Sequence, residues 1–151
     1  MDSYKNRLEY AAKLGFGEGT TIYHSSLVIG NVKVGKNVWI GPFTVLDGSG
    51  DLSIGDNCSI SAGVQIYTHD TIKKRLSGRK LLPEKKFTKI GNSCYIAPLV
   101  VIAKGVTIGN FVVIGVHSFV NKDIPDYSIV YGIPAKVHSN VKQEYREIFD
   151  R

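Results

Sequence analysis

An aliphatic side chain recurs at every sixth position over residues 90–120, and this spacing constrains the fold more than any other feature. A six-residue period matches neither the 3.6-residue period of an amphipathic helix nor the two-residue alternation of a simple strand. It is typical of a solenoid in which short parallel strands stack on one another. The aliphatic positions, called anchors below, are Ile90, Ile96, Ile102, Ile108, Ile114 and Val120.

The same spacing runs through the first half of the chain, with a two-residue insertion after Leu46 and a long one after Ile66. The chain then holds fifteen anchors. Three strands per coil give five coils, and both interruptions fall between complete sets of three. We therefore predict an all-β parallel solenoid of about five coils over residues 16–122. The earlier anchors are Phe16, Ile22, Val28, Val34, Ile40, Leu46, Ile54, Ile60 and Ile66.

Three segments fall outside the repeat, within a chain (1–151) that we interpret as one domain. Residues 2–15 predict a short amphipathic helix, begun by Asp2 or Ser3, that covers the first coil. Residues 68–89 form a protruding loop, of a length that is usually functional. Residues 123–151 are expected to leave the solenoid and end in a helix capped by Asn140.

Cys58 and Cys94 offer an internal check, because each lies four residues after an anchor in adjacent coils. They are expected to stack in the core, at the strand spacing of about 4.8 Å. We predict free thiols that pack as small apolar groups. Stacked parallel side chains rarely offer the dihedral that a disulfide requires.

Composition is that of a globular protein, with 43% apolar and 21% charged residues. The chain lacks an apolar run of the length that spans a membrane and an apolar signal at its start, and it has two cysteines. We therefore expect a cytoplasmic protein with no membrane span. The net charge of +6 favours anionic partners. Nucleic acid is not expected, because no basic motif is interleaved with aromatic residues.

The repeat, the loop that opens with a histidine and the closing motif V-x-G-x-P-A-K (residues 130–136) together resemble the hexapeptide-repeat acetyltransferases. The most similar branch comprises galactoside, maltose and xenobiotic acetyltransferases and their surface-polysaccharide relatives. The resemblance covers residues 16–137. It implies a left-handed parallel β-helix, a homotrimer, acetyl-CoA as donor and an active site between neighbouring subunits. The handedness follows from the resemblance alone, because parallel crossovers are generally right-handed.

His69 follows the last strand of the third coil, where the family carries its catalytic base. Acetyl transfer from a thioester to a hydroxyl or amine requires a group that takes a proton near neutral pH, and histidine does so. The resemblance implies that His69 is this general base; the alternative is a histidine of a surface loop. We predict no metal site, because no second His or Cys lies at ligand spacing. His117 is expected to face outward at a corner.

The resemblance also implies two sets of contacts with CoA. Small corner residues allow the backbone to approach the pantetheine arm, although they also suit ordinary corner packing. These are Ala97, Pro98, Gly115 and Val116. Cationic and polar residues are expected near the 3′-phosphate and the pyrophosphate. These are Asn121, Lys122 and Lys136.

The acceptor is expected beside Asp47, Tyr67 and Arg75, which border the loop. Trp39 and Tyr95 are predicted at corners, where they flank the acceptor or the pantetheine arm, or else pack subunits together.

The nature of the acceptor is less constrained. Gly41 replaces an asparagine of the galactoside members, which argues against a simple galactoside. The seven Lys or Arg residues between positions 73 and 86 suit either the pyrophosphate of a nucleotide-sugar or a solvated loop.

Together with these residues, the resemblance implies an acetyl-CoA-dependent acetyltransferase that acts on a hydroxyl or amine of a sugar or nucleotide-sugar, in the synthesis of surface polysaccharide such as lipopolysaccharide. One alternative is an acetyltransferase of antibiotics or other xenobiotics. Another class is a zinc-binding protein like the γ-carbonic anhydrases, or a structural β-helix. Zinc requires about three converging histidines, and the four histidines here are widely spaced.

Overall fold

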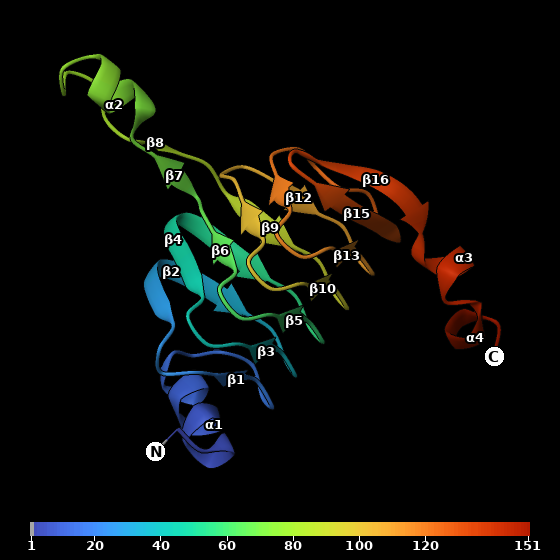
Figure 1. Cartoon of the computed structure of the whole chain (residues 1–151). Coiled ribbons are helices and arrows are strands. Elements are labelled where there is room, and N and C mark those ends of the chain that lie inside the picture. Colours follow the sequence, from blue (N-terminus) through green and yellow to red (C-terminus); the bar gives the residue numbers. More distant parts are fainter. Residues whose placement is uncertain (1) are drawn as a thin grey trace.

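The computed structural model describes residues 2–151 as a triangular column of short parallel strands with one projecting arm (Figure 1). The column is a left-handed parallel β-helix of about six turns. Its first face is a sheet in the order β1-β3-β5-β10-β13-β15-β16. These strands are β1 (Thr21–Ile22), β3 (Trp39–Ile40), β5 (Ser59–Ile60), β10 (Tyr95–Ile96), β13 (Val113–Ile114), β15 (Ser128–Gly132) and β16 (Ala135–Asn140).

The second and third faces share two long strands that turn the corner between them, β2 (Leu27–Val34) and β4 (Val45–Ile54). The first halves of β2 and β4 begin the second face, which continues through β6 (Gln65–Ile66), β11 (Val101–Ile102) and β14 (Phe119–Val120). Their last residues begin the third face, which continues through β9 (Thr88–Ile90) and β12 (Thr107–Ile108).

The core is made of the anchors, which stack into one ladder on each face. On the first face Ile60, Ile96 and Ile114 pair in register and are fully buried. Burying an isoleucine side chain stabilises a fold by about 1.5–3 kcal/mol relative to leaving it exposed. Because each two-residue strand places one residue inside and one outside, the six-residue repeat is the pattern that such a column requires.

The corner between the first and second faces is built from residues in the left-handed backbone region. Phe43, Leu99 and His117 all have φ near +60°. The His117 N–H donates to the Pro98 carbonyl of the preceding coil at 3.1 Å, which compensates the strain of this conformation. His117 is exposed there, so its prediction as an outward-facing corner residue is confirmed.

The solenoid continues beyond residue 122, so the predicted end of the column is wrong. Ile124 forms a parallel bridge with Ile108 on the third face, and β15 pairs in parallel with β13 on the first. Both Ile124 and Val130 are buried. The spacing from Val120 to Ile124 is four residues instead of six, which hid this incomplete sixth turn from a count based on a constant period.

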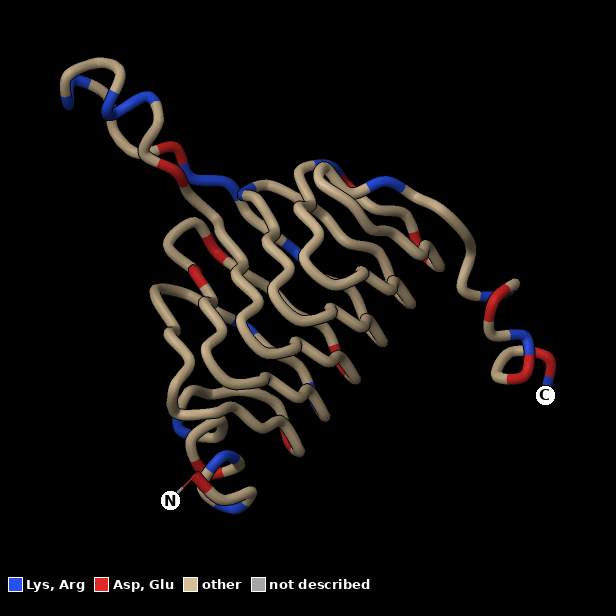
Figure 2. The backbone as a smooth tube through the Cα atoms, viewed as in Figure 1, with Lys and Arg blue, Asp and Glu red and all other residues tan. Residues whose placement is uncertain are grey.

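The predicted loop forms an arm (residues 69–87) with structure of its own. Strands β7 (His69–Asp70) and β8 (Glu84–Lys85) pair antiparallel, and the helix α2 (Ile72–Leu76) lies beyond them. Seven of the 19 Lys and Arg residues of the chain lie on this arm, and Figure 2 shows them mostly at its outer end.

Helices precede and follow the column in the chain, as predicted, but the second differs in form. The helix α1 (Tyr4–Lys13) begins at Ser3, whose Oγ accepts a hydrogen bond from the Asn6 N–H at 3.2 Å. Its Ala11 is buried against the first coil, whereas Tyr4 is exposed.

At the C-terminus of the chain, Asn140 is the predicted N-cap, but two short helices, α3 (Val141–Glu144) and α4 (Arg146–Phe149), replace the single helix. The non-helical backbone of Tyr145 separates them, and the Phe149 ring packs edge-on against Phe111 and Tyr127. This aromatic contact favours a bent end over a longer helix, which is marginal at such a length.

The cysteine prediction is confirmed. Ser59 pairs with Tyr95, so Cys58 and Cys94 lie side by side in adjacent coils, both buried and free. The Cys58 thiol donates to the Gly91 carbonyl at 3.2 Å. Among residues 2–151, no helix has the length and apolarity needed to cross a membrane.

Candidate active site

His69 lies at the root of the arm, at the corner between the second and third faces. It is the first residue of β7 and follows the anchor Ile66 by three positions. Its Nδ1 atom is 2.6 Å from Oδ2 of Asp47 and 3.0 Å from Oγ of Ser49. One third of the His69 side chain remains exposed. The ring is therefore held from one side and accessible from the other.

Asp47 is placed in the same corner by β4, one residue beyond the anchor Leu46. Only 1% of its side chain is exposed. Its Oδ2 accepts from the Thr68 N–H at 2.9 Å, and its Oδ1 accepts from the Ser49 N–H at 3.0 Å. Burial by itself raises the pKa of Asp47, but the hydrogen bonds from Thr68, Ser49 and His69 outweigh it and hold the pKa well below its usual range. The buried carboxyl is therefore ionised at neutral pH.

The ionised carboxylate determines which nitrogen of His69 carries the proton. A carboxylate only accepts hydrogen bonds, so Nδ1 must donate to Asp47. In the neutral ring the lone pair is then on Nε2, the nitrogen suited to take a proton from a bound molecule. When that proton arrives, the positive ring faces a negative carboxylate. This arrangement suits a general base with an orienting partner.

The structure gives Asp47 a different position from the predicted acceptor contact. Its carboxylate is buried and both of its oxygens are occupied by Thr68, Ser49 and His69, so it is not available to an acceptor. This partnership was not predicted from the sequence, and neither were the contacts of Ser49 and Thr68. The signal was present in the repeat, because Leu46 and Ile66 are stacked anchors and the residues that follow them must share a corner.

Tyr67 lies next to this corner, whereas Arg75 lies far from it. The Tyr67 hydroxyl donates to Oε1 of Gln65 at 2.7 Å, beside the end of the second face. Arg75 is exposed on α2, at the outer end of the arm, beyond β7 (Figure 1). Within one chain the structure does not bring Arg75 to His69.

Trp39 and Tyr95 were predicted at corners, and this prediction is wrong. They occupy outward positions in β3 and β10 of the first face and pair in register with Ser59 between them. Both are partly exposed. The first face lies opposite the corner that holds His69, so these aromatic residues and His69 face different directions within one chain.

The residues predicted to contact CoA fall into two groups on either side of the second face. Asn121 and Lys122 follow β14 directly, at the same corner as His69 and two strands further along. The other group lies at the corner between the first and second faces or on the adjoining hairpin, and consists of Ala97, Pro98, Gly115, Val116 and Lys136.

Gly115 illustrates how corner packing alone can require a small residue. Its N–H donates to the Val130 carbonyl at 2.8 Å, and a Cβ atom there would lie 2.8 Å from Cβ of Tyr131. The Ala97 N–H is likewise used within the column, by the Ile114 carbonyl at 3.0 Å. These two N–H groups are therefore not free to bind a pantetheine arm.

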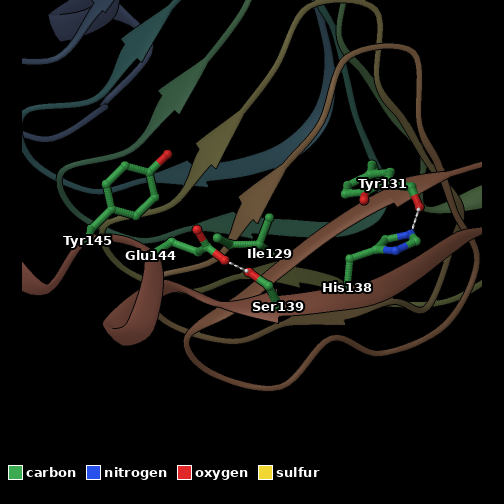
Figure 3. A pocket seen from close by; sticks show the side chains of 6 residues that line it. All are labelled: Ile129, Tyr131, His138, Ser139, Glu144 and Tyr145. Carbon is green, nitrogen blue, oxygen red and sulfur yellow. Dashed lines mark hydrogen bonds between the residues drawn. The ribbon is translucent and has the colours of Figure 1, made fainter.

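A separate cavity of about 620 Å³ lies between the β15–β16 hairpin and α3 (Figure 3). Tyr131 and His138 stack there with ring centroids 3.6 Å apart, and the Ser139 hydroxyl donates to Glu144 at 3.0 Å. His69 is not among its lining residues. Across residues 2–151, no group of three or more His, Cys, Asp or Glu side chains is arranged to hold a metal ion.

Comparison with known proteins adds to this geometry. The family model described as bacterial transferase hexapeptide (six repeats) matches residues 87–122. The galactoside O-acetyltransferase of Escherichia coli (strain K12) is 35% identical over 123 residues, which are 80% of this chain and 56% of that protein. WcaF of the same strain, named as an acetyltransferase of colanic acid biosynthesis, is 32% identical over 122 residues, 70% of this chain and 67% of that protein.

A solved structure, the maltose O-acetyltransferase from Clostridium difficile 630, superposes with a TM-score of 0.72 at 30% identity and covers 93% of this chain and 77% of that one. This chain thus spans little more than half of the galactoside protein and about two thirds of WcaF. With its stacked anchors and six-residue period, the chain belongs to the family of bacterial hexapeptide-repeat transferases.

Proposed function

We propose that this protein is an acetyltransferase that moves an acetyl group from acetyl-CoA to a hydroxyl or amine of a sugar or nucleotide-sugar. The observation that carries the proposal is the His69–Asp47 pair, a general base oriented by a buried carboxylate at an exposed corner. The names of the similar proteins, a galactoside and a maltose O-acetyltransferase, support acetyl transfer to a sugar.

The proposed reaction is direct transfer within a complex of both substrates. Nε2 of His69 removes the proton from the acceptor hydroxyl or amine as that group attacks the thioester carbonyl carbon. The carbon–sulfur bond then breaks, and the leaving CoA thiolate takes the proton back from His69. Asp47 stays ionised throughout and keeps the ring in the reactive tautomer. A backbone N–H is expected to stabilise the oxyanion between the two steps.

A complete site needs a neighbouring subunit in this proposal, and we propose a homotrimer. The residues predicted to contact CoA at the corner between the first and second faces (the first corner) and the aromatic residues of the first face lie away from the His69 of their own chain. They are therefore free to face the His69 corner of another copy. Exposed apolar side chains at the first corner support such contacts: Phe43, Leu99 and Val116.

The biological role in this proposal is the acetylation of precursors of surface polysaccharides in the cytoplasm, where acetyl-CoA is available. The similarity to WcaF supports this role. Lys122 and Lys136 are exposed, as groups that bind the phosphates of CoA must be. Arg75 and the other cations of the arm are proposed to contact the acceptor of a neighbouring subunit.

The test is an assay of acetyl-CoA consumption with a panel of sugars, nucleotide-amino-sugars and antibiotics. We expect His69→Ala to lower turnover by about 10²–10⁴-fold while the dissociation constant of CoA stays nearly unchanged. His24→Ala, at an exposed histidine near α1, is the matched control and should keep full activity. An unaltered rate in His69→Ala would remove His69 from the mechanism. Inactivity on the whole panel together with stoichiometric bound zinc would favour the zinc-protein alternative.

A further inference from the structure

We propose that Lys104 is a positioning residue, which ties the arm to the column and thereby holds His69 against Asp47. Lys104 follows β11 at the same corner as His69, one coil further along. Its Nζ atom is 2.7 Å from Oδ2 of Asp70 and 3.5 Å from Oε1 of Glu84. The effect of Lys104 on turnover rests on the proposed function, whereas its effect on the arm does not.

Lys104 contacts both strands of the arm at once. Asp70 and Glu84 are a register pair across the β7–β8 ribbon, and two carboxylates at such positions repel each other. The ammonium group lies within ion-pair distance of both and removes this repulsion. The neighbouring ammonium also holds the pKa of Asp70 below its usual range. Only about a fifth of the Lys104 side chain is exposed, so solvent screens these pairs less than a surface pair.

The other cations near Glu84 cannot replace this link. Lys73 and Lys86 are 2.7 Å and 3.5 Å from its carboxylate oxygens, but both belong to the arm itself. Among the lysine and arginine ion pairs of residues 2–151, those from Lys104 are the ones that connect the arm to another coil, and they act beyond the His69–Asp47 contact at its first residue.

The arm has few other contacts that would fix its direction. Its root is held by the Lys86 N–H, which donates to the Thr68 carbonyl at 2.8 Å, and by the Thr88 hydroxyl, which donates to the Tyr67 carbonyl at 2.8 Å. Beyond the root, the apolar side chains of α2, Ile72 and Leu76, are exposed rather than packed on the column.

His69 lies at the junction between this fixed root and the arm. Its backbone belongs to β7, immediately before Asp70, so a tilt of the ribbon would move the imidazole relative to Asp47. A small misplacement of a catalytic group is costly, because proton transfer depends on geometry. Lys104 is therefore expected to act on the reaction through His69, without touching the substrate.

The test compares Lys104→Met, which keeps the length and removes the charge, with Lys104→Arg, which keeps the charge. Lys5→Met is the matched control, because it removes an exposed ion pair with Glu9 on α1. Hydrogen exchange of peptides from residues 69–87 reports the arm directly. We expect Lys104→Met to raise their exchange rates roughly two- to fivefold, the effect of losing a partly exposed ion pair. Lys104→Arg and Lys5→Met should leave the rates unchanged.

In the acetyl transfer assay, we expect Lys104→Met to lower kcat about tenfold with little change in KM for acetyl-CoA, and Lys104→Arg to restore it. Asp70→Asn removes the shorter of the same contacts from the arm side and should raise exchange in the same peptides. Unchanged exchange in both Lys104→Met and Asp70→Asn would overturn the link. Faster exchange with an unchanged kcat would overturn the positioning role. If the wild-type protein transfers no acetyl group, the proposed function fails, while the exchange result still decides the link.

Discussion

Asp47 Oδ2 lies 2.6 Å from His69 Nδ1, although 22 positions separate the two residues in the chain. The repeat explains the contact. Leu46 and Ile66 are paired anchors of β4 and β6, so the residues that follow them meet at one corner. The insertion after Leu46 widens this corner and provides Ser49, whose N–H and Oγ contact Asp47 and His69 respectively. The column thus brings together a pair that no local motif would reveal.

Asp47→Asn should reverse the tautomer of His69. The asparagine amide can donate to Nδ1, which moves the ring proton to Nε2 and leaves no lone pair for the acceptor proton. We expect kcat to fall on the order of 10²–10⁴-fold, as for loss of the base itself, with CoA affinity retained. Steady-state kinetics with CoA titration calorimetry measures both. A kcat within twofold of the wild type, as a rough bound, would show that Asp47 does not orient the base.

Asp47 should also make the fold sensitive to acid. Its pKa in the folded protein lies below the unfolded value of about 3.9, so it binds a proton more readily when unfolded. Its contribution to stability is therefore fully present above about pH 5 and is lost as the pH falls through 3.9 toward the folded pKa. Between pH 5.5 and pH 3 the wild type should lose on the order of 1–2 kcal/mol more unfolding free energy than Asp47→Asn. Urea denaturation at the two pH values measures this difference, and parallel losses in both proteins would contradict it.

Much of the column could be predicted from the sequence because a constant period has few structural solutions. The positions of the anchors place Cys58 beside Cys94, His117 at a corner and His69 at the root of the arm, as the structure has them. These predictions depend only on counting along a repeat. They succeed because every coil repeats the geometry of the one before it.

The wrong predictions concern features that do not follow from the six-residue period alone. The four-residue step to Ile124 breaks the period although the strand stacking continues. Trp39 and Tyr95 each precede an anchor directly, so strand alternation places them outward on a face and not at a corner. The burial of Asp47 depends on hydrogen bonds from Thr68 and Ser49, which hydropathy does not show.

Ile96 provides a test of the core ladder. It is fully buried between Ile60 and Ile114, and Ile96→Ala would leave a cavity that rigid neighbouring coils cannot close. We expect a loss of about 2–5 kcal/mol in the free energy of unfolding. Ile72→Ala, at an exposed position of α2, should change it by less than about 0.5 kcal/mol. Urea denaturation of both variants measures the contrast, and equal effects would argue against the ladder as the main source of stability.

Thr68 and Thr44 form a matched pair for the hydrogen bonds that hold the corner of Asp47 and His69. Both are buried, but the Thr68 hydroxyl accepts from the Gly50 N–H at 2.8 Å and donates to the Asp47 carbonyl at 2.9 Å, whereas the Thr44 hydroxyl has no partner. Thr68→Val keeps the shape and leaves the Gly50 N–H without its acceptor. It should cost about 1–3 kcal/mol of unfolding free energy, because an unpaired buried donor loses its solvation without compensation.

Thr44→Val, by contrast, replaces an unpaired buried hydroxyl with a methyl group and should be neutral or stabilising. Urea denaturation of both variants measures the difference. The two substitutions remove the same atom from equally buried sites, so the hydrophobic change is common to both and their difference isolates the hydrogen bonds. If Thr68→Val were as stable as Thr44→Val, the threonine would not hold this corner, and the fixed geometry of Asp47 would have to come from the Thr68 and Ser49 N–H groups alone.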